Sequence, residues 1–139
     1  SCLSPCSDWD MSPKKIVEKS RERQLDLIAI CDHNTAENAA ATNAVDDLIL
    51  WASFPATDIS SRDFGAVSVF GTADGLTTID AIERSTDDLP EGTSFVTVNG
   101  AIHSHFGDYG LQPGDGEPTM PRDVAQDRIV QATLDFLSG

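Results

Sequence analysis

Four short, almost continuously apolar runs recur along the chain and alternate with longer amphipathic segments. Such runs are typical of strands buried on both faces of a parallel sheet, and they occupy residues 25–31, 48–53, 66–71 and 93–98. Segments with the apolar spacing or capping residues of helices surround them, at residues 12–23, 36–45, 77–89 and 122–137. We therefore predict an α/β fold: a Rossmann-like three-layer sandwich with a single parallel sheet of about four strands, in that spatial order, and helices on both faces.

The sequence gives more detailed predictions for two of these helices and for the loop between strand 93–98 and the last helix. Thr77 and Asp80 have the spacing of a capping box at the start of helix 77–89, and Pro90 would end that helix. Between strand 93–98 and the last helix, residues 100–121 are predicted to form a long loop rich in Gly, Pro and Asp. The last helix is expected to bury five apolar side chains, which are Ala125, Ile129, Ala132, Phe136 and Leu137.

Residues with catalytic potential follow two of the predicted strands. Strand 66–71 leads into a Gly-rich turn that carries Asp74, and strand 93–98 leads to His103. The carboxyl ends of parallel strands form the edge at which open α/β sheets build their sites. An acid after one strand and a histidine after the next has the spacing of an Asp–His pair in a catalytic triad. The alternative is that Asp74 is only a turn residue and His103 only a loop histidine.

Length and charge narrow the functional classes. The chain has 139 residues, of which 40% are hydrophobic, and we predict a single domain over residues 1–139. No apolar run is long enough to span a membrane. A net charge of −14 argues against nucleic acid and anionic membranes as partners, because both bind basic surfaces. We expect the outer strands to be exposed edges, which favour self-association as a dimer or by domain swapping.

The distribution of charge and of cysteines adds two expectations. Residues 1–42 carry a net charge of −2 and residues 43–139 carry −12, which indicates segments of two origins or, alternatively, an acidic domain with one basic helix. Cysteine occurs only at Cys2, Cys6 and Cys31, too few for a disulfide framework, although a local Cys2–Cys6 bond stays open. Together with the absence of a signal-peptide pattern at the start of the chain, this predicts a reducing compartment, the cytoplasm.

The N-terminal segment, residues 1–41, resembles a polymerase and histidinol phosphatase (PHP) domain, a family of metal-dependent phosphoesterases. The resemblance rests on residues 1–6, 11–17 and 25–38. It implies that His33 is a metal ligand, with Asp32 beside it. The family's His-x-His motif and its later ligands are missing from this sequence, and one histidine does not make a metal site.

Residues 42–139 resemble the C-terminal part of an α/β-hydrolase of the dienelactone-hydrolase-like kind. The matching residues are 47–55, 67–75 and 99–110. This resemblance implies that Asp74 is the acid and His103 the base of a catalytic triad, and it assigns no role to His105. The nucleophile of such a triad lies upstream on a G-x-S-x-G elbow, and this sequence contains no such motif.

The two resemblances meet near residues 39–44, where we predict a fusion junction. In the hydrolase family a strand, the nucleophile elbow and a helix precede the strand that corresponds to residues 48–53. Here strand 25–31, the turn 32–35 and helix 36–45 supply the same shape, with Asn34 at or near the position of the nucleophile. Asparagine is not a usable nucleophile. We therefore predict a chimera, natural or engineered, that folds as a partial α/β-hydrolase.

Three functions compete on this evidence. We expect a folded domain with no evolved activity, because the sites of both families are cut in half. The alternatives are an ester hydrolase that uses Asp74 and His103, and a remnant metal-dependent phosphoesterase at Asp32 and His33. No cofactor is certain. In a shared sheet, His33, His103 and Asp74 would lie at one edge and could bind Zn²⁺; the opposing expectation is that these groups are splayed and solvated.

Overall fold

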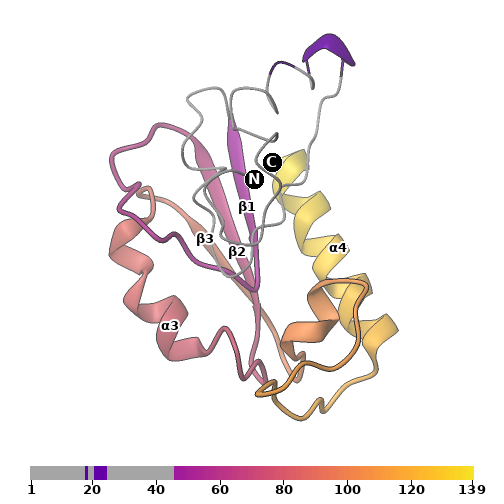
Figure 1. Ribbon diagram of the computed structural model, residues 1–139. Coiled ribbons are helices and arrows are strands. Elements are labelled where there is room, and N and C mark those ends of the chain that lie inside the picture. The colour runs from indigo at the N-terminus through magenta and orange to yellow at the C-terminus, as the bar shows by residue number, and fades with distance from the viewer. Residues whose placement is uncertain (1–17, 19–20, 25–45) are drawn as a thin grey trace.

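The computed structural model describes residue 18, residues 21–24 and residues 46–139. Three strands and two α-helices follow one another in the main described part, together with two short 3₁₀ helices (Figure 1). In chain order these are β1 (Asp47–Trp51), β2 (Gly65–Gly71), α3 (Ile79–Arg84), η1 (Thr86–Asp88), β3 (Ser94–Val98), η2 (His103–Phe106) and α4 (Arg122–Ser138).

The three strands form one parallel sheet in the order β1-β2-β3. Ile49 of β1 is paired with Val67 of β2, and Val69 of β2 is paired with Val96 of β3. This confirms the predicted direction and order of the three strands. The predicted strand 25–31 lies outside the described residues, so the four-stranded sheet and the self-association of its edges stay predictions.

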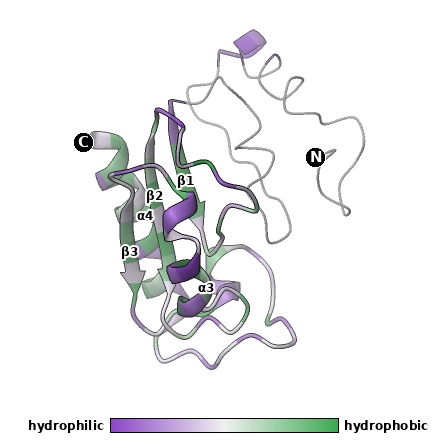
Figure 2. Ribbon diagram, turned by 90° about the vertical axis from the view of Figure 1, so that its left-hand side faces the viewer, coloured by the Kyte–Doolittle hydropathy of each residue, from purple (hydrophilic) through white to green (hydrophobic). Residues whose placement is uncertain are grey.

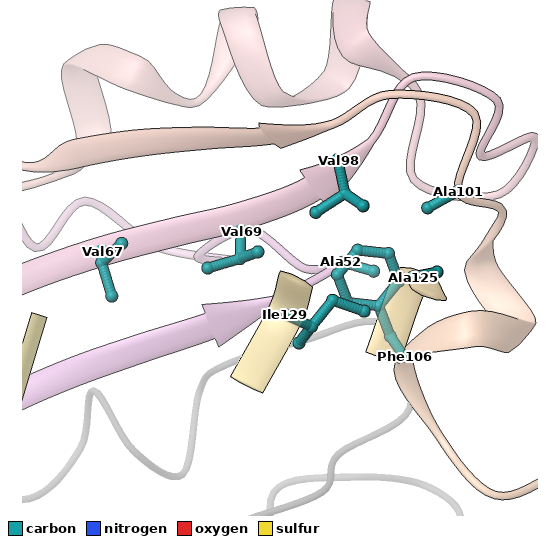
Figure 3. Close-up of a cluster of buried hydrophobic side chains, with 8 residues drawn as sticks. All are labelled: Ala52, Val67, Val69, Val98, Ala101, Phe106, Ala125 and Ile129. Atoms are coloured by element: carbon teal, nitrogen blue, oxygen red, sulfur yellow. The ribbon is translucent and has the colours of Figure 1, made fainter. Parts of the chain in front are cut away.

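The central strand β2 is buried on both sides, as its continuous apolar run predicts. Val67 and Val69 lie on the face toward α4, where they form a core cluster with Ala125 and Ile129 of that helix (Figure 3). A second cluster contains apolar side chains of both β1 and β2, and its members are Leu48, Leu50, Ile59, Ala66 and Leu89. Figures 1 and 2 place α3 and α4 on opposite sides of these three strands.

Three local predictions need correction. Thr77 does not cap α3: the N-cap is Thr78, whose hydroxyl accepts a hydrogen bond from Ala81 N–H, because the hydroxyl of Thr77 is directed to the carbonyl oxygen of Ala52. The α-helix ends at Arg84 rather than at residue 89, and a 3₁₀ turn continues it. Strand β1 ends at Trp51 because Ala52 adopts a left-handed backbone conformation, with φ at 42°.

The last helix follows its prediction at four of five positions. Ala125 and Ile129 are buried, and Ala132 and Phe136 are partly buried against the same cluster. Leu137 was expected in the core, but 45% of it is exposed. It is one position beyond Phe136, and a rotation of about 100° per residue turns it away from the sheet. Among the described residues, none of the helices has the length and apolar character needed to cross a membrane.

Candidate active site

The turn after β2 holds Asp74 in a fixed position. Its side chain is directed back into the turn, where Oδ1 accepts hydrogen bonds from the N–H groups of Leu76 at 2.8 Å and Thr77 at 2.7 Å. The residue is only 6% exposed. These two hydrogen bonds orient the buried carboxylate and replace the hydrogen bonds to water that it loses on burial.

His103 begins the 3₁₀ helix η2, which follows β3 after a short loop. The residue is 9% exposed, and its Nδ1 lies 2.9 Å from Oδ2 of Asp74. The two residues that the sequence predicted as acid and base therefore form a buried pair across 29 positions of the chain. A carboxylate can only accept a hydrogen bond, so Nδ1 carries the proton and Nε2 is left as the basic nitrogen.

The electrostatics of the pair favour the charged form of the imidazole. The hydrogen bond to Asp74 raises the pKa of His103 above its ordinary value; burial opposes this, and the negative charges of Asp74 and Asp115 add to the rise. Because His103 nonetheless has a raised pKa, its Nε2 is a stronger base than that of a free imidazole. An imidazolium formed at this position would be stabilised by the carboxylate next to it.

The loop after β3 contains the 3₁₀ helix η2 and Asp115, neither of which was predicted from the sequence. Residues 103–106 are all buried, although the whole segment 100–121 was predicted as an irregular loop. Asp115 lies further along this loop and accepts hydrogen bonds from the backbone N–H groups of both His103 and Ser104, each at 2.9 Å. The only local signal for it is the Gly114-Asp115-Gly116 triplet, which indicates a turn but not its partners.

His105 differs from His103 in its surroundings. It is 6% exposed, and its Nδ1 is buried with no hydrogen-bond partner. Burial lowers its pKa, and the nearby positive charge of Arg122 lowers it further, against an opposing contribution from Asp115. Arg122 itself donates to the carbonyl oxygen of Gly107 and to Asp108. His105 is therefore a neutral, buried histidine outside the Asp74–His103 pair.

The predicted metal site cannot be placed beside this pair. Asp32, His33 and Asn34 lie outside the described residues. In the part of the chain that the structure describes, there is no group of three or more His, Cys, Asp or Glu side chains that could hold a metal ion. Binding of Zn²⁺ with the help of His33 stays a prediction.

The arrangement suits general-base chemistry. Nδ1 of His103 is engaged by Asp74, and no hydrogen bond to Nε2 is found within the described residues, so this nitrogen is available to take a proton. The sequence has no G-x-S-x-G motif that would bring a serine to it. The site thus has the acid and the base of a triad arrangement without the usual nucleophile.

Comparison with known proteins agrees with this arrangement. A sequence profile described as the alpha/beta hydrolase family matches residues 29–127. The match takes in the turn 32–35 and crosses the predicted junction near residues 39–44; the PHP resemblance and the chimeric origin stay predictions. No curated protein and no solved structure matches the chain. Because the family profile covers more than half of the 139 residues, the protein belongs to the α/β-hydrolase family.

Proposed function

We propose that the protein is a slow ester hydrolase, in which His103 is the general base and Asp74 orients it. The observation that carries the proposal is the buried contact of 2.9 Å between His103 Nδ1 and Asp74 Oδ2. The family supports it, because α/β-hydrolases use a histidine that follows the acid in chain order. In this chain Asp74 precedes His103 in the same way.

The reaction we propose consists of the addition of water to the ester carbonyl, followed by breakdown of the tetrahedral intermediate. Nε2 of His103 removes a proton from a water molecule while the water oxygen bonds to the carbonyl carbon. The tetrahedral intermediate then breaks its bond to the alcohol oxygen, and the proton on Nε2 passes to that leaving oxygen. Asp74 stabilises the imidazolium that exists between the two transfers and does not itself take the proton.

No acyl-enzyme forms in this proposal. Asn34 lies at or near the usual nucleophile position of the family, and an amide side chain does not attack esters. General-base assistance alone contributes roughly 10²- to 10⁴-fold over the uncatalysed reaction. We therefore propose turnover that is slow and single-phase, without the burst that signals a covalent intermediate.

A folded protein without evolved activity is the second candidate. The observation that favours it is the absence of a G-x-S-x-G motif from all 139 residues. In this case the Asp74–His103 pair would be a structural remnant that joins two loops. A third possibility, a phosphoesterase remnant at Asp32 and His33, would require bound metal, and metal analysis of the purified protein tests it directly.

Hydrolysis of p-nitrophenyl acetate separates the first two candidates. The chain has three histidines, so His33→Gln serves as the matched control for His103→Gln. We expect His103→Gln and Asp74→Asn to lose the protein-dependent rate, whereas His33→Gln keeps it. An equal loss in His33→Gln, or no protein-dependent rate at all, contradicts the proposal. A burst of p-nitrophenol that disappears in His103→Gln would show instead that a nucleophile is present.

A further inference from the structure

The carboxylate of Asp115 joins the two loops that carry the acid and the base. Its Oδ1 accepts hydrogen bonds from the N–H groups of Gly116 at 2.8 Å, His103 at 2.9 Å and Gly75 at 3.4 Å. Its Oδ2 accepts one from Ser104 N–H at 2.9 Å. Gly75 directly follows Asp74, and Ser104 directly follows His103. One side chain therefore contacts the backbone of His103 and that of Gly75, the neighbour of Asp74.

These bonds require an unusually close approach of two backbone segments. A Cβ added at Gly116 would overlap the carbonyl oxygen of Ala73, and one added at Gly75 would lie 2.8 Å from Gly116 N. Glycine at both positions therefore permits the contact. Because the segments are this close, the short side chain of Asp115 reaches the N–H groups of both. A glutamate, which is one methylene longer, would place its carboxylate elsewhere.

The other bonds between the two loops end before His103. Gly100 N–H donates to the hydroxyl of Thr72 at 2.8 Å, and Ala73 N–H donates to the carbonyl oxygen of Ala101 at 3.0 Å. They hold the ends of β2 and β3 together. At residue 103, Asp115 accepts the backbone N–H, and the hydroxyl of Tyr109 donates to the carbonyl oxygen at 3.4 Å. Among the described residues, the N–H of His103 has Asp115 as its hydrogen-bond partner.

The charge of Asp115 acts in the same direction as its hydrogen bonds. Burial raises the pKa of this carboxyl, but the N–H groups of Ser104, His103, Gly116 and Gly75 together bring it below the usual aspartate value. Asp115 is therefore an anion at neutral pH. Besides Asp74, it is the other carboxylate whose charge raises the pKa of His103.

We propose that Asp115 is a positioning residue of the Asp74–His103 pair. It fixes the backbone of His103 against the turn of Asp74, so that Nδ1 meets Oδ2 and Nε2 has one orientation before a substrate binds. The catalytic meaning of this role rests on the proposed function, whereas the geometric role does not. A residue that acts in this way never touches the substrate and affects the reaction only through His103.

Two variants separate the placement of the Asp115 carboxylate from its charge. Asp115→Asn removes the charge and replaces one of the two accepting oxygens with an N–H₂ group. Asp115→Glu keeps the charge but moves the carboxylate. Asp58→Asn is the matched control, because Asp58 also accepts a backbone N–H, from Ser60 at 2.9 Å, and the change in net charge is the same.

The primary readout is the ring ¹⁵N and Nδ1–H signals of His103 in NMR spectra, with ester hydrolysis as the second readout. We expect both Asp115 variants to lose the fixed Nδ1–H signal and to lower the His103-dependent rate about 10- to 100-fold, the effect of a small misplacement. Asp58→Asn should leave both unchanged. A signal lost with no His103-dependent hydrolysis in the parent protein would uphold the positioning role and reject the proposed function.

Two outcomes would overturn the inference. One is an unchanged His103 signal in Asp115→Asn; the other is full rescue by Asp115→Glu, which would show that only the charge matters. If the variants fail to fold, hydrogen exchange in the parent protein tests whether Asp115 has the positioning role. The amides of Gly75, His103 and Ser104 should then exchange more slowly than free amides at the same pH, and this protection should fall together as acid protonates Asp115. Exchange of these amides at the rate of a free loop would reject the positioning role.

Discussion

The hydroxyl of Thr77 donates a hydrogen bond of 2.8 Å to the carbonyl oxygen of Ala52, and both groups are buried. Ala52 follows β1, whereas Thr77 lies in the turn that also gives its N–H to Asp74. Asp74 in turn holds His103 beyond β3. A continuous set of hydrogen bonds therefore crosses the carboxyl edge of the sheet, from the end of β1 to the predicted base. Networks of this kind fix side-chain orientation when every member is satisfied.

The carboxylate of Asp74 should matter for stability as well as for chemistry. Replacing it with alanine leaves the buried N–H group of Thr77 and the partly buried N–H group of Leu76 without an acceptor. We expect Asp74→Ala to lower the free energy of unfolding by about 2–4 kcal/mol, measured by urea denaturation. Asp74→Asn retains an oxygen for those two groups and should cost clearly less. Equal losses in the two variants would contradict the assigned hydrogen bonds.

The raised pKa of His103 predicts how stability depends on pH. A histidine with a higher pKa in the folded than in the unfolded state binds its proton more tightly when folded. Its contribution is fully present below the unfolded value of about 6.5 and is lost as the pH rises through the folded value. We expect this part of the pH dependence of unfolding to be absent in His103→Gln. Identical profiles above pH 6.5 would argue against the charge interaction with Asp74.

Two glycines in the loop after β3 provide a matched test of the backbone contact. A Cβ at Gly116 would overlap the carbonyl oxygen of Ala73, whereas a Cβ at Gly110 would meet nothing within 4 Å. We expect Gly116→Ala to lower the free energy of unfolding by about 1–3 kcal/mol, because the two segments must separate. Gly110→Ala should be close to neutral by the same measurement. A neutral Gly116→Ala would mean that the two loops are further apart than described.

The packing of α4 on the sheet can be tested within the helix itself. Ile129 is 2% exposed in the cluster with Val67 and Val69, whereas Val130 is 49% exposed. We expect Ile129→Ala to cost about 2–4 kcal/mol of unfolding free energy and Val130→Ala about 0.5 kcal/mol or less. Thermal or urea unfolding of the two variants distinguishes them. Similar effects at both positions would contradict the orientation of the helix.

The sheet was predictable because its strands are short, continuous apolar runs. β2 and β3 begin and end within one residue of the predicted runs. The meeting of Asp74 and His103 was also predictable, since the ends of neighbouring parallel strands share one edge. Both inferences depend only on local composition and on chain order.

The remaining details depend on contacts between distant residues. The sequence favours Thr77 as the helix cap through its spacing to Asp80, but the hydroxyl of Thr77 bonds to Ala52 and Thr78 caps α3 instead. The bonds of Asp115 reach residues 11, 12 and 40 positions away. No periodicity in the chain reports such contacts, so the loop that orders the base could not be foreseen.

The pH dependence of ester hydrolysis tests the central claim most directly. The quantity to measure is the rate with the parent protein minus the rate with His103→Gln, from pH 5 to pH 9. Because Nε2 must be unprotonated to act as a base, and because the pKa of His103 is raised, this difference should rise with pH through one midpoint above about 6.5. No difference at any pH, or a midpoint below that value, would contradict the account of Asp74 and His103 as a working acid–base pair.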